Sequence, residues 1–332
     1  MKRVNVLGAG SWGTGLALTL AAKGLEVGFW GRDQALMAEI SRTRINARYL
    51  SHAVLPEAVE VYSDFSKMPQ ADATLVVVPS QGFHETMVKA AAADFSQRCG
   101  ILVSCTKGIT LDKGQRMSQL MQQHFPSTPI AVLSGPNHAE EVVNHLPTAA
   151  VIACEDDSMG QQLQSVFTLP WFRSYRTTDV CGVEWAGALK NVYAIASGIA
   201  EGLKLGDNAV AALVTRALAE MSRFGQCMGG KAETFYGLSG VGDLVATCFS
   251  PHSRNHRVGV ALGQGRSLQE IVSSTSMIAE GVHNTLSLHR CARLAEVRTP
   301  LLDAVHAVLY ENRPAPLVLQ DLFSRDAGRE ED

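Results

Sequence analysis

The 332-residue sequence has no apolar run long enough to cross a bilayer, which takes about 20 residues in a helix. It also lacks an excess of one charge, because 29 Lys and Arg stand against 32 Asp and Glu, and it has no long basic run. Lys2 and Arg3 precede apolar residues, but polar residues and glycines interrupt that stretch, which is unlike a signal peptide. We therefore expect no transmembrane segment, no nucleic-acid partner and no export.

Paired cysteines are missing as well. The seven Cys are odd in number and form no CxxC pair. This argues against a secreted disulfide framework and against a zinc knuckle, and it favours a reducing compartment. The sequence therefore predicts a cytoplasmic protein without a bound metal.

In the first half of the chain, short β-rich runs alternate with helical segments. Several runs are apolar throughout, as in parallel strands that are covered on both faces. The alternation predicts an α/β fold with a doubly wound sheet. The expected strands are Arg3–Leu7, Leu25–Trp30, Val59–Tyr62, Ala73–Val78, Ile101–Ser104, Ile130–Leu133 and Ala149–Ala153. The expected helices are Ser11–Lys23, Gln34–Arg44, Phe83–Ala93 and Lys113–His124.

After about Asp179 the strand signal disappears. Val180–Leu203 and Asn208–Phe224 are typical of long, Ala-rich helices, with Asp207 expected as an N-cap and Gly225 as a residue just past the helix end.

Further helical segments follow, and Pro300 is expected to open one of them. We therefore expect an α/β dinucleotide-binding domain over residues 1–179 and an all-α domain over residues 180–332, with a cleft between them. The charged tail from Arg325 is expected to fray.

The sequence Gly-Ala-Gly-Ser-Trp-Gly follows the first expected strand and opens a helix. In this context Gly8 permits a tight turn, Gly10 lets a pyrophosphate approach the backbone, and Gly13 lets the helix lie close to the sheet. The helix N-terminus offers free N–H groups to phosphates. The pattern predicts a Rossmann-type domain that binds NAD(H) or NADP(H).

The end of the second strand bears on which of the two is bound. An acidic residue there binds the ribose 2′-OH of NAD, but Trp30 is followed by Gly31 and Arg32. A guanidinium at Arg32 suits a 2′-phosphate. Asp33 lies at a plausible distance for the ribose hydroxyl, but it also fits the N-cap of the helix from Gln34. NADP(H) is favoured and NAD(H) remains possible.

Lys107 follows an expected strand, at the sheet edge where ligands of such folds collect. The alternative is a solvated loop lysine. Lys190 lies within an expected helix, and its neighbours one turn away are small or apolar. We expect it to be buried and able to protonate a carbonyl oxygen, although a lysine at a domain edge would fit the same pattern.

Two later segments carry charge that suits a phosphorylated substrate. The glycine-rich stretch from Gly237 delivers Asp243, which could hold Lys190 or a hydroxyl group. Arg254 follows and offers a fork of donors for a phosphate. Taken alone, each is equally consistent with a surface turn or a surface arginine.

These pieces occur together, and the chain resembles the bacterial NAD(P)-dependent glycerol-3-phosphate dehydrogenases over essentially its whole length. The matching segments are GAGSWGT (Gly8–Thr14), CTKGI (Cys105–Ile109), SGPNHAEEV (Ser134–Val142), LKN (Leu189–Asn191), GLSGVGDL (Gly237–Leu244), SRN (Ser253–Asn255) and AEG (Ala279–Gly281). The resemblance implies an enzyme that interconverts dihydroxyacetone phosphate and sn-glycerol 3-phosphate. It also implies that the glycerol 3-phosphate is used for phospholipid synthesis.

The resemblance also implies roles for single residues. Lys190 would be the proton donor and acceptor in contact with the substrate, and Lys107 would lie between nicotinamide and substrate. Asp243 would support Lys190 and the substrate hydroxyls. Further substrate contacts would be Gly135, Asn137, Ser253, Arg254 and Asn255. Cofactor contacts would be Ser11, Trp12, Arg32, Lys107, Ala139, Arg254 and Glu280, beside the glycines. Asn137 departs from the Ser or Thr usual in the family, and its larger amide is expected to alter that contact.

Two other functions fit parts of the pattern. A dehydrogenase of the β-hydroxyacid or 6-phosphogluconate type would share the architecture but act on a carboxylate. A catalytically silent NADPH sensor would need no buried lysine, so the setting of Lys190 argues against it. A homodimer is the default expectation for the assembly.

Overall fold

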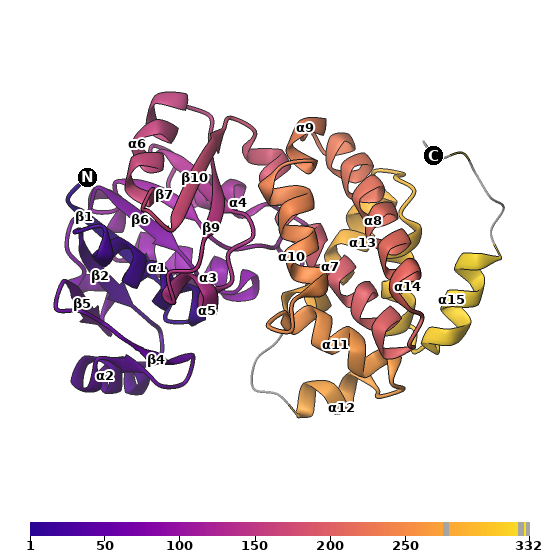
Figure 1. The fold of residues 1–332 in the computed structure, drawn as a ribbon. Helices are drawn as coiled ribbons and strands as arrows, with labels where there is room; N and C mark the ends of the chain where they lie inside the picture. Colours follow the sequence, from indigo (N-terminus) through magenta and orange to yellow (C-terminus); the bar gives the residue numbers. More distant parts are fainter. Residues whose placement is uncertain (275–278, 325–328, 330–332) are drawn as a thin grey trace.

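The computed structural model describes residues 1–274, 279–324 and 329, and it has two regions that lie side by side (Figure 1). The first is built on a sheet and the second on helices. The strands are β1 (Arg3–Leu7), β2 (Glu26–Trp30), β3 (Ile45–Asn46), β4 (Leu50–Val54), β5 (Val59–Tyr62), β6 (Ala73–Val76), β7 (Ile101–Ser104), β8 (Ile130–Ser134), β9 (Thr148–Cys154) and β10 (Phe172–Thr177).

Helices of the first region cover both faces of the sheet (Figure 1). They are α1 (Ser11–Ala22), α2 (Gln34–Thr43), α3 (Ser80–Ala92), α4 (Met117–His124), α5 (Ala139–Val143) and α6 (Asp157–Phe167), with the short 3₁₀ turns η1 (Phe65–Lys67) and η2 (Phe95–Gln97). The second region contains α7 (Val180–Gly202), α8 (Asp207–Cys227), α9 (Ala232–Phe235), η3 (Leu238–Gly242), α10 (Asp243–Phe249), α11 (Arg254–Gly263), α12 (Leu268–Ser273), α13 (Glu280–Leu294), α14 (Pro300–Tyr310) and α15 (Ala315–Phe323).

The eight-stranded sheet has the order β10-β9-β8-β7-β6-β1-β2-β5. Chain order reverses between β1 and β6, which is the switch point where ligands of doubly wound sheets bind. The apolar β1, β6 and β7 are buried on both faces. The predicted Rossmann-type α/β fold is confirmed.

Two features of the sheet differ from the sequence prediction. The pairing of β8 with β9 is antiparallel, so β9 and β10 run opposite to the other strands. Sequence analysis also missed β10, because this edge strand alternates buried and exposed residues and carries Arg173 and Arg176. The β3–β4 hairpin was missed because β4 is largely exposed and lacks an apolar run.

In the helical region, α7 is buried around most of its surface. Its closest partner is α11, and glycines allow the approach: a Cβ on Gly198 would lie 2.1 Å from the carbonyl oxygen of His256, and one on Gly259 would lie 2.1 Å from that of Ile195. Backbone therefore packs on backbone. This contact brings the N-terminus of α11 beside the middle of α7.

The predicted ends of α8 were wrong. Gly206 is the N-cap and Asp207 is already the first helical residue. Gly225 does not end the helix, which continues to Cys227. A Cβ at Gly225 would lie 1.9 Å from the ring of Phe235, so this glycine serves close packing rather than termination. The prediction that Pro300 opens a helix is confirmed.

The passage between the two regions is short. Strand β10 ends at Thr177, and the carboxylate of Asp179 accepts a hydrogen bond from the N–H of Gly182 at the start of α7. In the part of the chain that is described, no helix is both long and apolar enough for a bilayer crossing. The tail from Arg325 lies outside the described residues, apart from Arg329.

Candidate active site

The glycine turn lies at the switch point of the sheet. Gly8 has φ +129°, and a Cβ there would lie 2.3 Å from the carbonyl oxygen of Val77. A Cβ on Gly13 would lie 1.8 Å from the carbonyl oxygen of Gly8, whereas one on Gly10 would meet no atom within 4 Å. Two glycines are thus required by the turn itself, while Gly10 faces open space beside the uncapped N-terminus of α1. This cradle fits the pyrophosphate of a dinucleotide.

Residues around the cradle differ in whether their polar groups have hydrogen-bond partners. The Ser11 hydroxyl donates to the carbonyl oxygen of Tyr49 at 3.1 Å, and Trp12 Nε1 is buried without a partner. Ala139, at the start of α5, is buried and lies close to Gly15 of α1. The predicted cofactor residues Ser11, Trp12 and Ala139 therefore lie around one helix N-terminus.

The segment after β2 bears on the choice of dinucleotide. Asp33 caps α2 by accepting from the N–H of Leu36, and it forms an ion pair with Arg48 at 2.9 Å. This confirms the N-cap interpretation and leaves Asp33 poorly placed to hold a ribose. Arg32 is exposed, and its guanidinium forms no hydrogen bond or ion pair with the described residues.

The two predicted lysines meet at one carboxylate. Lys190 Nζ lies 2.9 Å from Asp243 Oδ1, and Lys107 Nζ lies 2.8 Å from Asp243 Oδ2. Lys190 comes from α7, Lys107 from the loop after β7, and Asp243 from the start of α10. Both Lys190 and Asp243 are buried, which confirms the expected burial of Lys190.

Lys107 also contacts the turn after β8. Its Nζ donates to the carbonyl oxygen of Gly135 and to Asn137 Oδ1, each at 2.8 Å. Gly135 has φ +123°, which favours glycine. The amide of Asn137 is thereby oriented, and its Nδ2 is buried without a partner.

Burial and charge act together on this cluster. Burial lowers the pKa of Lys107 to about 8, opposed by Asp243 and assisted by the positive charge of Lys190. Burial alone would raise the pKa of Asp243, but the two ammonium groups outweigh it and the pKa lies below its ordinary value. Asp243 is therefore a carboxylate at neutral pH, and Lys107 is a cation that can lose its proton near pH 8.

The predicted phosphate residues lie at the N-terminus of α11. The hydroxyl of Ser253 caps the helix by accepting from the N–H of His256. Asn255 donates to Asn191 Oδ1 at 2.8 Å and accepts from the N–H of Gly281 at 2.9 Å. Its amide thus joins α7, α11 and α13. That Ser253 and Asn255 contact a phosphate remains a prediction.

Arg254 differs from its neighbours. It is the first residue of α11 and forms no hydrogen bond or ion pair with the described part of the chain. Glu280 opens α13 and accepts from the N–H and hydroxyl of Ser80, at 3.1 and 2.5 Å, across the boundary between the two regions. Burial raises the pKa of Glu280.

Sequence analysis missed three polar residues that contact the lysines. Lys190 Nζ donates to Thr247 Oγ1 at 2.7 Å, and the amides of Asn191 and Asn284 donate to the carbonyl oxygen of Lys107 at 3.2 and 3.3 Å. Thr247 follows Asp243 by one helical turn, which is a signal the sequence does contain. Asn284 gave no such signal, because it lies 177 residues from Lys107.

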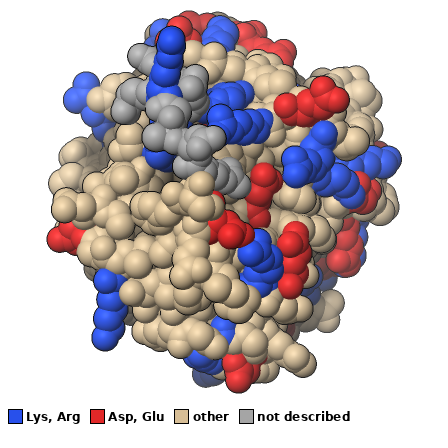
Figure 2. All heavy atoms as spheres, turned by 90° about the vertical axis from the view of Figure 1, so that its right-hand side faces the viewer, with Lys and Arg blue, Asp and Glu red and all other residues tan. Residues whose placement is uncertain are grey.

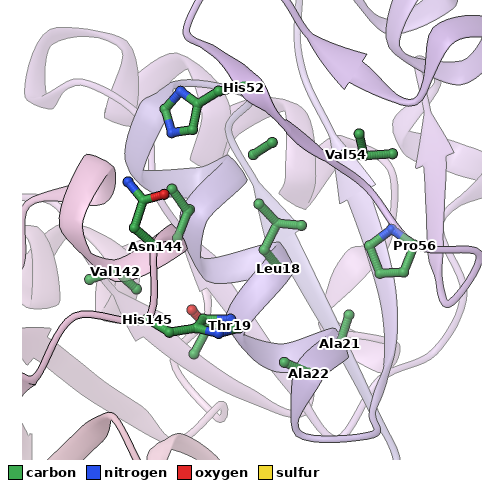
Figure 3. A pocket seen from close by; sticks show the side chains of 12 residues that line it. Leu18, Thr19, Ala21, Ala22, His52, Val54, Pro56, Val142, Asn144 and His145 are labelled. Atoms are coloured by element: carbon green, nitrogen blue, oxygen red, sulfur yellow. The ribbon is translucent and has the colours of Figure 1, made fainter.

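A pocket of about 450 Å³ lies elsewhere, between α1, β4 and the end of α5 (Figure 3). Leu18, His52, Asn144 and His145 are among the residues that line it, and none of the predicted site residues does. The charged cluster around Asp243 is thus distinct from this hollow. Within the described residues, no three His, Cys, Asp or Glu gather into a possible metal site.

Comparisons with known proteins point to the same family in both regions of the chain. The family profile described as NAD-dependent glycerol-3-phosphate dehydrogenase N-terminus matches residues 3–160, and the corresponding C-terminus profile matches residues 179–320. A glycerol-3-phosphate dehydrogenase [NAD(P)+] of Chlorobium phaeobacteroides is 42% identical, with 99% of each chain covered. One of Prosthecochloris aestuarii is also 42% identical, covering 97% of this chain and 98% of its own.

Solved structures agree with the sequence comparisons. The crystal structure of glycerol-3-phosphate dehydrogenase from Coxiella burnetii superposes with a TM-score of 0.92 at 37% identity, covering 98% of this chain and 99% of that one. The enzyme from Saccharomyces cerevisiae gives a TM-score of 0.83 at 26% identity, covering 98% and 99%. The chain therefore belongs to the NAD-dependent glycerol-3-phosphate dehydrogenase family.

Proposed function

We propose that this chain is an NAD(P)-dependent oxidoreductase that interconverts dihydroxyacetone phosphate and sn-glycerol 3-phosphate. The observation that carries the proposal is the pair of lysines on one buried carboxylate, Lys190 and Lys107 on Asp243. A redox reaction at a ketone needs a proton source and a positive environment for the developing oxyanion. The cluster supplies both. Its loop is linked to the dinucleotide cradle through Val78, which accepts a hydrogen bond from Thr106 and lies beside Gly8.

The residues that would hold the cofactor are those around the cradle. Gly8 and Gly13 allow the turn, and Gly10 leaves the backbone open to the pyrophosphate. Arg32 is free to pair with a 2′-phosphate. When bound, the nicotinamide supplies the hydride to the ketone carbon or accepts it in the reverse direction. We infer that NADP(H) is preferred, because Asp33 is already engaged by the N–H of Leu36 and by Arg48.

The chain's own residues would perform the proton chemistry. In the direction of ketone reduction, Lys190 Nζ donates its proton to the substrate oxygen, and in oxidation the neutral amine takes it back. Lys107 stabilises the negative charge that develops on that oxygen. Asp243 keeps both ammonium groups oriented, and Thr247 Oγ1 holds Lys190 from a second side.

Substrate recognition would depend on Arg254. Its guanidinium has no hydrogen-bond or ion-pair partner among the described residues and sits at a helix N-terminus, so a phosphate there would meet two favourable groups. The phosphate is remote from the reacting carbon, and its binding energy can therefore position the ketone.

The direct test is NADPH oxidation with dihydroxyacetone phosphate, using unphosphorylated dihydroxyacetone as the control. We expect rapid oxidation with the phosphorylated ketone and little with the control. Activity on a β-hydroxy or keto carboxylate alone would instead favour the related dehydrogenase class, and cofactor binding without any turnover would favour a sensor.

Finer features of the proposal concern the cell. We propose a cytoplasmic enzyme that supplies glycerol 3-phosphate for phospholipid synthesis, in keeping with seven free thiols that suit a reducing compartment.

A homodimer is supported by the end of the helical region, where a broad uncharged area lies among scattered charges (Figure 2). That region also exposes apolar side chains, including Leu294 and Phe323. Light scattering at micromolar concentration tests the dimer, and a monomeric mass would contradict it.

A further inference from the structure

The loop that carries Lys107 belongs to the sheet region by sequence, yet it is held by the helical region at both ends. We call residues 105–116, between β7 and α4, the Lys107 loop. At its start, Asn191 of α7 and Asn284 of α13 both donate to the carbonyl oxygen of Lys107, at 3.2 and 3.3 Å. At its end, Arg116 forms an ion pair with the buried Glu184 of α7 at 2.7 Å.

The middle of the Lys107 loop is held in the same way. The guanidinium of Arg290, on α13, donates to the carbonyl oxygen of Leu111 at 2.7 Å. Gly114 has φ +64°, and a Cβ there would lie 2.3 Å from Cys291 Sγ of α13. Helix α13 therefore follows the Lys107 loop along its length.

Asn284 is the residue of α13 that donates a hydrogen bond to the backbone of Lys107. Its side chain is only 1% exposed, its Nδ2 bonds Lys107, and its Oδ1 has no partner. Gly108 makes this approach possible, since a Cβ there would lie 3.0 Å from Asn284 Oδ1 and 2.8 Å from Ser80 Cβ. A buried amide oxygen without a hydrogen-bond partner lowers the stability of the fold. This cost indicates that Asn284 has a functional role.

We infer that Asn284 is a positioning residue for the reaction: it fixes the backbone of Lys107 relative to the helical region, so that the ammonium group stays on Asp243 and Asn137. The inference rests on the proposed function, in which Lys107 stabilises charge on the substrate oxygen. A lysine has a long, flexible side chain, and Lys107 Nζ must reach groups of both regions at 2.8 Å. A fixed backbone removes part of that freedom.

The surroundings of Lys107 give this role a measurable signature. The titratable groups that interact with this ammonium or with its cluster are Asp243, Lys190, Cys105, His138 and Cys248. Burial is the largest cause of its lowered pKa. If the Lys107 loop shifts outward, water reaches the ammonium, burial decreases, and the pKa of Lys107 rises.

The test compares Asn284→Ala with Ser287→Ala. Ser287 lies on the same helix, is equally buried and has no hydrogen-bond partner for its Oγ, so it is a matched control. We expect Asn284→Ala to lower kcat about tenfold, in line with the sensitivity of catalysis to small misplacements. The alkaline limb of the kcat profile should move to higher pH, and KM for NADPH should stay unchanged. Ser287→Ala should change none of these.

A second readout needs no turnover. Hydrogen exchange in peptides that cover the Lys107 loop should be faster in Asn284→Ala and unchanged in Ser287→Ala. If the alanine variant fails to fold, Asn284→Leu keeps the approximate size of the side chain and loses the Nδ2 donor without adding a charge beside Lys107, and the same results are expected from it.

Two results would overturn the inference: an unchanged kcat in both Asn284 variants, or a lower kcat with the alkaline limb and the exchange rates unmoved. The proposed function can fail separately. Wild-type protein without activity on dihydroxyacetone phosphate would refute the function, while faster exchange confined to the Asn284 variants would still support the positioning of Lys107.

Discussion

The two regions of the molecule contribute to the site in different ways. In residues 1–178 the buried polar side chains are those of Asn, Ser and Thr, whereas the buried Asp, Glu and Lys side chains lie at or beyond Asp179. The sheet region offers backbone: a glycine turn and helix N-termini. The helical region offers buried charge, with Lys190 and Asp243 held between helices, and the sheet region adds only the partly exposed Lys107 to this cluster.

This difference has a physical origin. A dinucleotide phosphate is bound well by N–H groups that the fold already presents, so the sheet region needs no buried charge there. Proton transfer needs an ionisable group, and burial of such a group is tolerated where it is paired. In the dinucleotide cradle, substitutions should therefore lower activity when they add atoms. In the cluster around Asp243, they should lower activity when they remove functional groups.

The largest effect is expected at the buried lysine. Lys190→Ala should lower kcat by about 10²–10⁴-fold, because the proton donor is lost. Steady-state rates with NADPH and dihydroxyacetone phosphate measure it, with Lys113→Ala as a control on an exposed loop lysine. A nearly normal kcat in Lys190→Ala would remove the helical region from the chemistry.

The next largest effect is expected when a side chain is added at Gly10. Gly10→Val should raise KM for NADPH about a hundredfold, equivalent to roughly 3 kcal/mol, because the side chain would occupy the pyrophosphate cradle. The melting temperature should hardly change, since a Cβ there meets no protein atom within 4 Å. Gly13→Ala is the contrast: its Cβ would clash with the backbone of Gly8, so stability should fall too. Equal loss of stability in both variants would contradict the cradle.

A smaller kinetic effect tests the charge contributed by the sheet region. Arg32→Ala should lower the preference for NADPH over NADH roughly tenfold, the worth of one charge-assisted contact. The measurement is the ratio of kcat/KM for the two cofactors. Arg42→Ala is the matched control, because Arg42 is an exposed arginine in the last turn of α2 and has no proposed role. An unchanged ratio in Arg32→Ala would refute the role of Arg32.

The packing of α7 on α11 gives a prediction about stability. Gly→Ala within a helix normally stabilises by up to about 1 kcal/mol, but Gly259→Ala should lower the melting temperature by several degrees, since overpacking costs about 1–3 kcal/mol. Its Cβ would press on the carbonyl oxygen of Ile195. Gly82→Ala, on α3, is the control, as the nearest contact of a Cβ there is at 4.0 Å. A higher melting temperature in Gly259→Ala would contradict the close contact.

The last effect is seen only as a change with pH and concerns the buried carboxylate of Glu220. Burial raises the pKa of Glu220 from 4.5 to about 7, against the N–H groups of Leu301 and Leu302 that bond it. Between these values the folded chain holds a proton that the unfolded chain releases, so stability falls as pH rises from about 4.5 to about 7. Glu220→Gln should lose this slope. Melting temperatures across that range measure it, and parallel curves for the two proteins would argue against the raised pKa.

How far the sequence could predict the site depended on how local each signal was. The turn from Gly8 to Gly13 was predictable because its constraints act within a few residues. Lys190 was predictable as buried from its helical neighbours alone. By contrast, β10 was not predicted, since an edge strand with alternating exposure has a weak apolar pattern.

The site residues that were missed share one property. Thr247, Asn191 and Asn284 carry uncharged hydroxyl or amide groups, which occur on helices for many reasons. Of the three, only Thr247 has a local signal, because it follows Asp243 by one helical turn. The end of α8 was wrongly predicted at Gly225 for a related reason. From the sequence alone, a glycine that ends a helix cannot be told apart from a glycine that makes room for an aromatic ring. Their meaning comes from a partner far along the chain.

The sequence by itself determined the α/β fold, the dinucleotide turn and the identity of the charged groups, since backbone sterics and apolar periodicity are written in neighbouring residues. Only the tertiary structure decided that Lys190 and Asp243, 53 positions apart, share a hydrogen bond, and that Asn284 holds Lys107 from 177 positions away. Such meetings follow from how helices pack, in this case through glycines that let α7 and α11 touch. Packing is a property of surfaces in three dimensions, which a local pattern does not contain.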